Sequence, residues 1–304
     1  MGTPEFAVPA LKALNQYDYD VDLVVTQPDR PKGRGRKPVF PPVKKAAIEL
    51  GYEVIQPVSI KTGEFSECIE NLKPDLFVVV AFGHILPENL LALPRMGAIN
   101  IHASLLPKYR GPSPIHQAII NGEKESGATI MFIDKGLDTG DILLNAKEKI
   151  TSDDTSSTLH DRLAILGADL LIKALNGLES GAIKPVPQDH TQSSYAPLLK
   201  KKDGHIDWNL PAGTIESFIR GMTPWPGAFT FFDKKRLKIF KAESKEMNLN
   251  DSPGTVIKGF PDELCVATGN GSLCILEIQG ASGKRLSVKD FLRGCKIPPG
   301  TTLT

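Results

Sequence analysis

The chain has 304 residues, of which 41% are hydrophobic and 23% are charged, and its formal net charge is +1. This length and composition predict a globular protein with a large core and about two domains, and we find no internal repeat or low-complexity tract. Because the net charge is close to zero, an anionic partner must be met by a local cluster of Lys and Arg side chains. No apolar stretch reaches transmembrane length and no signal peptide is visible, so we expect a reducing cytoplasm, either a bacterial cytosol or an organelle matrix.

The four cysteines are scattered, with no C-x-x-C pair and no histidine at ligand-like spacing. This argues against a structural zinc site and against a disulfide framework. We therefore predict no metal, and buried or free thiols at Cys68, Cys265, Cys274 and Cys295.

The first two thirds of the chain alternates strand-like and helix-like segments. Apolar residues at helical spacing predict helices over 7–16, 42–51, 113–122 and 158–181. Apolar or β-branched runs predict strands over 21–27, 52–57, 75–83, 98–104 and 128–133, and the run at 75–83 is apolar on both faces, as in a central parallel strand. This order predicts an α/β fold, a Rossmann-like layer structure with a mostly parallel sheet.

Beyond about residue 190 the pattern changes. A helix is predicted over 213–222, and short strands separated by turns follow from 228 to 279, with Asn270-Gly271 as a hairpin signal between two β-rich runs. We expect an α/β catalytic domain over 1–189, a linker over 190–204 and a small OB-like β-barrel over 205–304.

Asn100 and His102 stand two residues apart at the end of one predicted strand. Because side chains alternate along a strand, these two point to one face while Ile99 and Ile101 point to the other. Ligands of open parallel sheets bind outside the carboxyl ends of the strands, so the pair is a candidate site. The spacing alone leaves a second interpretation open, in which His102 is a core histidine and Asn100 a turn residue.

Longer motifs carry a resemblance to a known family. The segments are "NIHASLLPKYRGPSPIHQAIING" and "GATIMFIDKGLDTGDIL", with "MGTPEFAVPAL", "VVTQPDRPKGRGRK" and "VVAFGHILP" upstream and "WPGAFT" downstream. Together they resemble the folate-dependent formyltransferases over essentially the whole chain, and in particular the members that act on initiator tRNA. The resemblance implies that 10-formyltetrahydrofolate, as co-substrate, donates a formyl group to the α-amino group of methionyl initiator tRNA, for translation initiation.

The family's catalytic Asn, His and Asp fall on Asn100, His102 and Asp138. Amide and imidazole N–H groups can stabilise the negative charge that develops on the formyl oxygen when the amine attacks. Asp138 would orient the His102 ring, favour its protonated form and help to relay a proton. From its surroundings alone Asp138 can also be a turn carboxylate, and we keep that interpretation for Asp141.

The resemblance also implies a folate pocket, lined in the family by the stretch around 82–86 and by the loop that carries Asp138. The implied folate contacts are Phe82, Gly83, Ile85, Leu86, Ser104, Leu105, Leu106 and Pro107. Ser104 lacks the surroundings of a hydrolase nucleophile, so we assign it to loop geometry. Without the resemblance, the pattern of "AFGHILP" favours a strand end followed by a turn.

The segment from Arg30 to Lys45 contains seven basic residues and no acidic one. As a bare charge run it would be a solvated loop. In the family this segment contacts the acceptor arm of the tRNA, which implies tRNA contacts at Arg30, Lys32, Arg34, Arg36 and Lys37, with Lys44 and Lys45 nearby. Lys200, Lys201, Lys202 and basic residues of the barrel would extend this track along the phosphates. We expect a monomer with no membrane partner.

One departure from the family concerns the start of the chain. In the family a short apolar strand precedes the match to "MGTPEFA", whereas this sequence begins at Met1. We therefore expect a parallel sheet without one inner strand, which a start site assigned a few codons late or a truncated chain would explain better than a naturally shorter enzyme.

Rival functions remain open on the residues alone. A formyltetrahydrofolate hydrolase and formyltransferases acting on a sugar amine or a purine precursor would share the same three catalytic residues. A protein of another class would bind nucleic acid through its barrel, without turnover. A nicotinamide enzyme is disfavoured because no G-x-G-x-x-G follows an early strand.

Overall fold

The computed structural model describes residues 1–32, 37–247, 250–257, 262–281 and 283–304, with the backbone alone at Lys32 and Lys37. It divides into two compact units, the first made of 1–114, 125–149 and 160–196 and the second of 115–124, 150–159 and 197–304. The main division falls between Ala196 and Pro197, inside the segment predicted as a linker. Two earlier segments, 115–124 and 150–159, also belong to the second unit. The predicted domains were each continuous in sequence and therefore did not include them.

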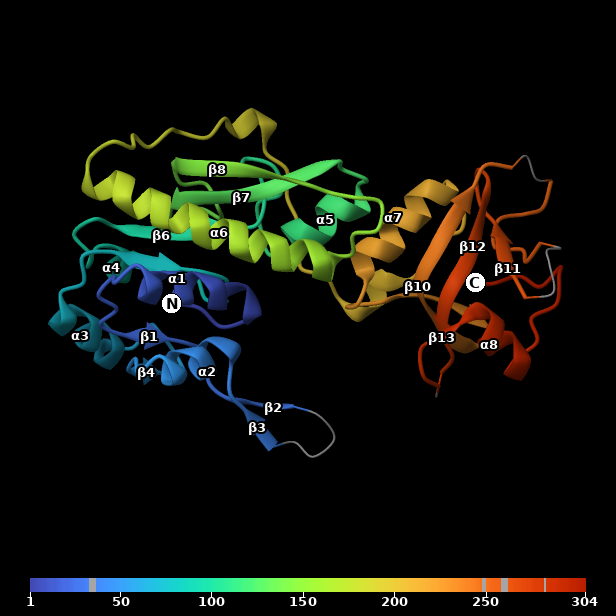
Figure 1. Cartoon of the computed structure of the whole chain (residues 1–304), viewed down its shortest axis with the longest axis horizontal. Helices are drawn as coiled ribbons and strands as arrows, with labels where there is room; N and C mark the ends of the chain where they lie inside the picture. The colour runs from blue at the N-terminus through green and yellow to red at the C-terminus, as the bar shows by residue number, and fades with distance from the viewer. Residues whose placement is uncertain (33–36, 248–249, 258–261, 282) are drawn as a thin grey trace. The chain divides into compact units, whose positions relative to one another are not determined.

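Short strands and helices alternate through the first unit (Figure 1). Its strands are β1 (Val24–Val25), β2 (Arg30–Lys32), β3 (Lys37–Val39), β4 (Val54–Ile55), β5 (Phe77–Val79), β6 (Ala98–His102), β7 (Glu125–Phe132) and β8 (Ile142–Lys149). Its helices are η1 (Glu5–Ala7), α1 (Val8–Gln16), α2 (Pro42–Glu49), α3 (Gly63–Leu72), α4 (Glu88–Leu91), η2 (His190–Gln192) and most of α6 (Ser156–Glu179). The sequence patterns did not predict α3, α4, β8 or the β2–β3 pair.

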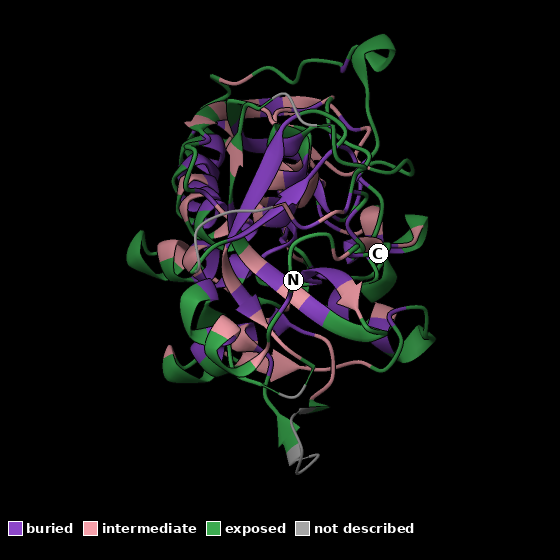
Figure 2. Ribbon diagram, turned by 90° about the vertical axis from the view of Figure 1, so that its right-hand side faces the viewer, coloured by how far each residue is buried: buried purple, intermediate pink, exposed green. Residues whose placement is uncertain are grey.

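The strand pairings confirm the α/β class. β1 pairs with β4 and β5 with β6, both in parallel, whereas β6, β7 and β8 are successively antiparallel. The β1–β4 sheet is thus parallel, and the β5–β6–β7–β8 sheet is parallel at β5–β6 and antiparallel at its last two pairings. Four of the five residues of β6 and six of the eight residues of β7 are buried, and Figure 2 shows buried residues gathered along strands.

The long helix α6 covers the sheet that contains β6 and β7 (Figure 1). Its Gly167 faces Ile101 of β6 so closely that an added Cβ would lie 2.6 Å from the Ile101 side chain. Leu159, Leu163 and Leu171 of this helix are fully buried. Close packing against α6 therefore fixes β6 from one side.

Met1 and Gly2 lie between β1 and β5, which belong to different sheets. The Met1 ammonium donates to the Val78 carbonyl at 2.7 Å, and the Val80 N–H donates to the Met1 carbonyl at 2.9 Å, as in a parallel strand. On the other side, the Gly2 N–H donates to the Val25 carbonyl at 3.0 Å.

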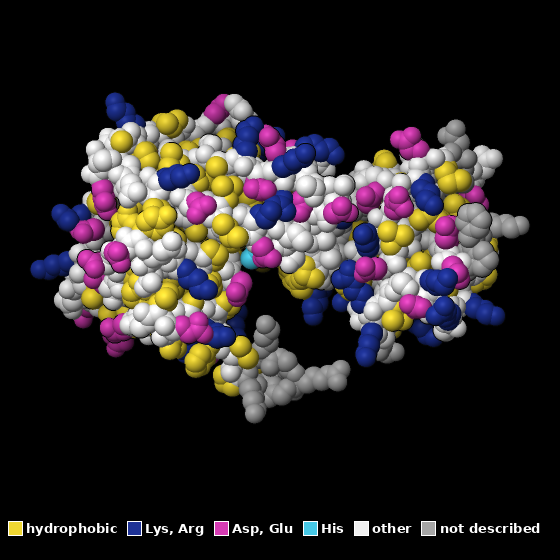
Figure 3. All heavy atoms as spheres, in the orientation of Figure 1, with side chains coloured by type: hydrophobic (Ala, Val, Ile, Leu, Met, Phe, Trp, Pro, Cys, Tyr) yellow, Lys and Arg dark blue, Asp and Glu magenta, His cyan; other side chains and the backbone are white. Residues whose placement is uncertain are grey.

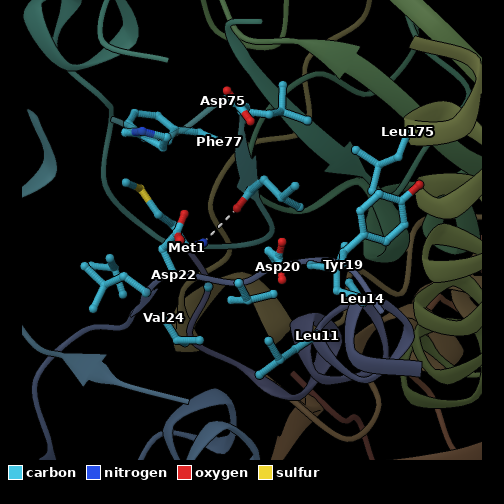
Figure 4. Close-up of a pocket in the computed structure, with 18 of the residues that line it drawn as sticks. Met1, Leu11, Leu14, Tyr19, Asp20, Asp22, Val24, Asp75, Phe77 and Leu175 are labelled. Carbon is cyan, nitrogen blue, oxygen red and sulfur yellow. Dashed lines mark hydrogen bonds between the residues drawn. The ribbon is translucent and has the colours of Figure 1, made fainter. Parts of the chain in front are cut away.

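A cavity of about 800 Å³ extends from Met1 between the two strands (Figure 4). Many of its walls are apolar, with Leu11, Val24, Phe77 and Leu175 among the lining residues. Met1 thus lies at the edge of a cavity between β1 and β5.

The second unit is a curled antiparallel sheet with helices. Its strands are β9 (Ala228–Phe232), β10 (Lys235–Lys245), β11 (Leu264–Ala267), β12 (Ser272–Gln279) and β13 (Leu286–Ser287). They are ordered β11-β12-β10-β9, with β13 beside β12. The helices are η3 (Lys201–Gly204), α7 (Ala212–Met222), α8 (Val288–Gly294) and nearly all of α5 (Pro114–Ile120). The predicted hairpin is confirmed, because Ala267 of β11 faces Ser272 of β12 across the turn that contains Asn270-Gly271.

The prediction of four unpaired thiols is wrong for two of them. Cys265 and Cys274 occupy facing positions of β11 and β12, with Cα atoms 4.1 Å apart, and form a disulfide. Cys68 and Cys295 are free. The hairpin was visible in the sequence, but its register was not, and only the register places the two sulfurs face to face.

Candidate active site

The end of β6 presents the first two candidate residues. Ile99 and Ile101 are 0% and 4% exposed and pack into the core, so alternation leaves Asn100 and His102 on the opposite face. Asn100 is half-buried and His102 is buried. β6 lies between β5 and β7, which fixes its position on both edges.

Both ring nitrogens of His102 face oxygen atoms. Nε2 lies 2.9 Å from the Tyr109 carbonyl, and Nδ1 lies 3.6 Å from Oδ2 of Asp138. Since a carbonyl oxygen can only accept, Nε2 carries a proton when this bond forms. Nδ1 is then the nitrogen that Asp138 addresses, and the structure brings this predicted pair together.

Asp138 lies on the loop between β7 and β8, far from His102 in sequence. Its Oδ2 also accepts a hydrogen bond of 2.7 Å from the Gly111 N–H. Its backbone φ is 53°, in the left-handed region that non-glycine residues seldom occupy. Tyr109, which holds the other ring nitrogen, has a φ of 61°. Strained backbone of this kind clusters at functional sites, where the surrounding structure enforces it.

The loop after β6 is fixed by side-chain contacts. The Thr129 hydroxyl of β7 donates to the Ser104 carbonyl at 2.6 Å and accepts from the Leu106 N–H at 3.2 Å. The Ser104 hydroxyl donates to the Lys108 carbonyl at 2.6 Å, in agreement with a role in loop geometry. Gly111 has a φ of 109°, and an added Cβ would lie 2.8 Å from the Ala196 carbonyl, so a side chain there would displace the N–H that holds Asp138.

Two buried residues beside this loop were missed by the sequence analysis. Arg110 donates through Nε and Nη2 to Oε1 of Gln188, and Nε2 of Gln188 donates to the carbonyls of Asp138 and Gly140. Arg110 lies within the quoted motif, but an arginine beside a glycine gives no sign that it is buried. Gln188 lies outside every motif, and only the fold brings it to the Asp138 loop.

The predicted folate residues fall into two groups. Phe82 and Leu86 are 2% and 6% exposed and belong to the core, and Ser104 and Leu106 are also buried. Gly83 and Ile85 are exposed, Ile85 by 81%, and Leu105 and Pro107 are half-buried. Any direct contact of Phe82 and Leu86 with a ligand would be limited by this burial, and the exposed Gly83 and Ile85 are the better placed pair.

The loop that carries Asp138 lies close to the segment after β5. Lys135 forms an ion pair with Glu88, with Nζ and Oε1 3.6 Å apart. Near this pair along the chain, Ile85 and Leu137 expose 81% and 49% of their surface. The two loops thus expose apolar side chains close to each other, which leaves apolar surface available to a ligand.

The basic segment forms a hairpin where it is described. β2 and β3 pair antiparallel, with Arg30 facing Val39 and Lys32 facing Lys37. The exposed Arg30 donates through Nη2 to Oε1 of Gln27 at 2.6 Å. The calls at Arg34 and Arg36 lie outside the described residues.

Lys44 forms an ion pair with Asp29. The sequence analysis did not predict this pair, because the segment from Arg30 to Lys45 contains no acidic residue. The Lys44 Nζ lies 2.8 Å from Oδ2 of Asp29, the residue just before the basic run, and 3.9 Å from the centre of the Phe40 ring. Hydrogen bonds from Lys44 and Gln56 hold the pKa of the Asp29 carboxyl below its usual value. The Lys44 charge is therefore largely balanced within the unit.

Basic side chains of the second unit include the exposed Lys200, Lys201 and Lys202 at η3. On the face drawn in Figure 3, Lys and Arg side chains lie among Asp and Glu side chains. This mixture agrees with the small net charge of +1. Among the described residues, no three His, Cys, Asp or Glu side chains gather as metal ligands would, and no described helix is long and apolar enough to cross a membrane.

Comparison with known proteins gives consistent results over the whole chain. Residues 1–175 match the family model described as formyl transferase, and residues 198–296 match that of the formyl transferase C-terminal domain. The methionyl-tRNA formyltransferase of Caldanaerobacter subterraneus subsp. tengcongensis is 52% identical over 304 residues, covering 100% of this chain and 98% of that protein. The methionyl-tRNA formyltransferase of Pelotomaculum thermopropionicum is 50% identical and covers 100% of this chain and 97% of its own length.

Solved structures agree at the level of the fold. The N-formyltransferase from Helicobacter canadensis, in complex with folinic acid and dTDP-3-aminofucose, has a TM-score of 0.68 at 21% identity, covering 94% of this chain and 97% of that one. The sugar 3N-formyltransferase WlaRD has a TM-score of 0.66 at 21% identity, covering 93% and 97%. The two family matches and the identity of about half along the full length show that this chain belongs to the formyltransferase family, together with the methionyl-tRNA formyltransferases.

Proposed function

We propose that this chain transfers the formyl group of 10-formyltetrahydrofolate to the α-amino group of methionyl initiator tRNA, and that Asn100, His102 and Asp138 carry the reaction. The observation that supports these roles best is the distance of 3.6 Å between Oδ2 of Asp138 and Nδ1 of His102. His102 lies two residues beyond Asn100 on strand β6. The full-length relatives at about 50% identity, which are methionyl-tRNA formyltransferases, support the acceptor.

The reaction forms one C–N bond and breaks another. The neutral amine bonds to the formyl carbon, the bond from that carbon to the folate nitrogen breaks with its electron pair remaining on that nitrogen, and one proton passes from the amine to the folate nitrogen. Negative charge develops on the formyl oxygen in between, so fixed N–H donors at that oxygen lower the barrier. We assign this role to the Asn100 amide, and we assign the proton relay to the His102 ring, whose two nitrogens face the Tyr109 carbonyl and Asp138.

Asp138 keeps the His102 ring in one orientation and assists the transfer of the proton through that ring. We assign the relay to Nδ1, because Nε2 is held by the Tyr109 carbonyl at 2.9 Å. The Gly111 N–H holds the carboxylate at the same time, so Asp138 is oriented before substrate arrives.

The folate co-substrate supplies the activated formyl group. We place its ring against the exposed Gly83 and Ile85, near the Asp138 loop, with the half-buried Leu105 and Pro107 beside it. Phe82, Leu86, Ser104 and Leu106 would support this surface from beneath, because their side chains are buried.

We propose that the segment from Arg30 to Lys37 contacts the acceptor arm of the tRNA. Within it Arg34 stands between Gly33 and Gly35 in the sequence. The reaction belongs to translation initiation, so we propose a cytoplasmic location, in a bacterial cytosol or an organelle matrix, and a monomeric enzyme.

Arg34→Ala tests the tRNA contact separately from the chemistry. We expect kcat/KM for methionyl-tRNA to fall by about 10-fold to 150-fold, since a hydrogen bond to a charged group is worth roughly 1.5–3 kcal/mol, while affinity for a folate analogue stays unchanged. The slope of log affinity for tRNA against log salt should become shallower by somewhat less than one, because one phosphate contact is removed. Lys73→Ala, a basic residue at the C-cap of α3, is the matched control. Unchanged tRNA kinetics in Arg34→Ala, or a loss of folate affinity equal to the loss of tRNA affinity, would mean that the segment is a solvated loop without a tRNA contact.

Formation of formylmethionyl-tRNA by the purified protein tests the proposed function as a whole. Release of formate with no acceptor product would identify a hydrolase instead.

A further inference from the structure

We propose that Gln188 is a positioning residue for this reaction: its side-chain amide holds the Asp138 loop in the conformation that places the carboxylate beside His102, and Arg110 fixes the amide. The inference rests on the proposed function of Asp138, and it assigns a role to two buried polar residues outside the three catalytic ones.

The Gln188 side chain is 6% exposed and uses both ends of its amide. Oε1 accepts from Arg110 Nε at 3.1 Å and from Nη2 at 2.6 Å. Nε2 donates to the Asp138 carbonyl at 3.0 Å and to the Gly140 carbonyl at 2.7 Å. Because a guanidinium can only donate, the amide oxygen must face Arg110 and the amide nitrogen must face the loop.

The anchor for this contact is rigid. Val186, two residues before Gln188, exchanges backbone hydrogen bonds of 2.8 and 2.9 Å with Ile142 at the start of β8. The Gln188 backbone is therefore tied to the sheet, and its side chain reaches from there to the loop. Buried groups locked by packing and by further hydrogen bonds are what keep a catalytic side chain in place.

The loop needs such support because its backbone is strained. Asp138 has a φ of 53°, a conformation that costs an aspartate free energy unless neighbouring contacts enforce it. Two contacts do so at opposite ends of the residue: the Gly111 N–H binds the carboxylate, and Gln188 binds the carbonyl. Arg110 precedes Gly111 in the chain and also binds Gln188, so the two contacts form one connected network.

Arg110 also connects this network to the segment 188–196. It is 9% exposed, its N–H donates to the Ser194 carbonyl at 2.8 Å and its carbonyl accepts from the Ala196 N–H at 2.7 Å. Its Nη2 lies 3.1 Å from Nδ1 of His190. The side chain and the backbone of one residue thus join the segment 188–196 to the loop that contacts Asp138.

Gln188→Glu separates the two halves of the amide. A glutamate keeps acceptors for Arg110 and gains an ion pair with it, so the fold should persist, but it offers no hydrogen to the carbonyls of Asp138 and Gly140. We expect kcat to fall about tenfold to thirtyfold, because a displacement of a catalytic group by about 1 Å can cost up to a hundredfold in rate. The KM values for both substrates should stay within about twofold, since Gln188 contacts neither in this proposal. Gln188→Met, which removes both halves, should lower kcat at least as much.

Gln192→Glu is the matched control, because Gln192 lies four residues further along and donates to Asp189 at the surface. It should retain the kcat of the unmodified protein. Each variant is measured at a temperature where circular dichroism shows the native fold.

A double-mutant comparison identifies the route of the effect. If Gln188 acts through Asp138, then Gln188→Glu in an Asp138→Ala background should change kcat by less than about twofold. Multiplicative losses, a kcat of Gln188→Glu within twofold of the unmodified protein, or failure of both Gln188 variants to fold would each overturn the positioning role. Absence of formyl transfer in the unmodified protein would instead overturn the proposed function, so the two failures are distinguishable.

Discussion

Alanine at Asn100, at His102 or at Asp138 is expected to lower kcat for formyl transfer by about two to three orders of magnitude, with little change in folding. The reason is that these side chains act on charge that develops during the reaction, and loss of one such donor typically costs about 10²–10³ in rate. The measurement is single-turnover formation of formylmethionyl-tRNA, with the thermal midpoint recorded for each variant.

Asp141→Ala is the control for the loop, because Asp141 shares the segment with Asp138 while its backbone carbonyl makes the hydrogen bond to Phe132. Its kcat should stay close to that of the unmodified protein. The double variant of His102 and Asp138 should lose far less than the product of the two single losses, since residues that act as one unit are not additive. Near-normal activity in any of the three single variants would remove that residue from the mechanism.

The second large effect concerns the cavity between β1 and β5. Adding about five apolar residues to the Met1 nitrogen should raise the thermal midpoint by roughly 5–15 °C, because each large apolar side chain that becomes buried contributes about 1.5–3 kcal/mol. The hydrogen bonds of Met1 and Gly2 to the flanking strands set the direction in which the added segment would run.

The buried ammonium adds a dependence on pH. Burial lowers the pKa of the Met1 amine from 8.0 to about 5, although the residue as a whole is only partly buried. Above pH 8 the amine is neutral in both the folded and the unfolded chain, and this group has no effect. Between pH 8 and pH 5 the unfolded chain binds a proton that the folded chain does not, so the free energy of unfolding falls as the pH falls. The full loss, present below pH 5, is at most about 4 kcal/mol.

Denaturation at pH 5 and at pH 8 measures both effects. The apolar extension should raise stability at both values and reduce the difference between them, because an amide replaces the amine. An extension of five Ser and Gly residues is the control: it should reduce the pH difference with little gain at pH 8. Equal stability of all three proteins at both pH values would mean that the added segment does not fill the cavity and that burial of the Met1 amine does not lower the stability.

The sequence predicted those parts of the site that depend on local order. Asn100 and His102 could be placed on one face of a strand end because alternation along a strand is a property of the backbone. The approach of Asp138 to His102 came from the resemblance and not from spacing, since His102 ends β6 while Asp138 lies on the loop between β7 and β8, and nothing local links them.

Contacts between distant segments could not be predicted from the sequence. Gln188 reaches the Asp138 loop because Val186 pairs with Ile142, and this pairing has no signal in the residues around either one. For the same reason the Lys44 side chain was counted in a basic surface, although Asp29 pairs with it at 2.8 Å. The Cys265–Cys274 disulfide likewise depends on the register of β11 against β12.

The most direct test of the central claim follows the formyl group of 10-formyltetrahydrofolate in the presence of methionyl initiator tRNA, an amino-sugar nucleotide, or water alone. We predict that formylmethionyl-tRNA forms in equal amount with tetrahydrofolate, that neither of the other two acceptors gives comparable turnover, and that His102→Ala abolishes most of the transfer. Formate release at the same rate without tRNA, transfer to the sugar amine in place of tRNA, or binding of tRNA with no product would contradict the account.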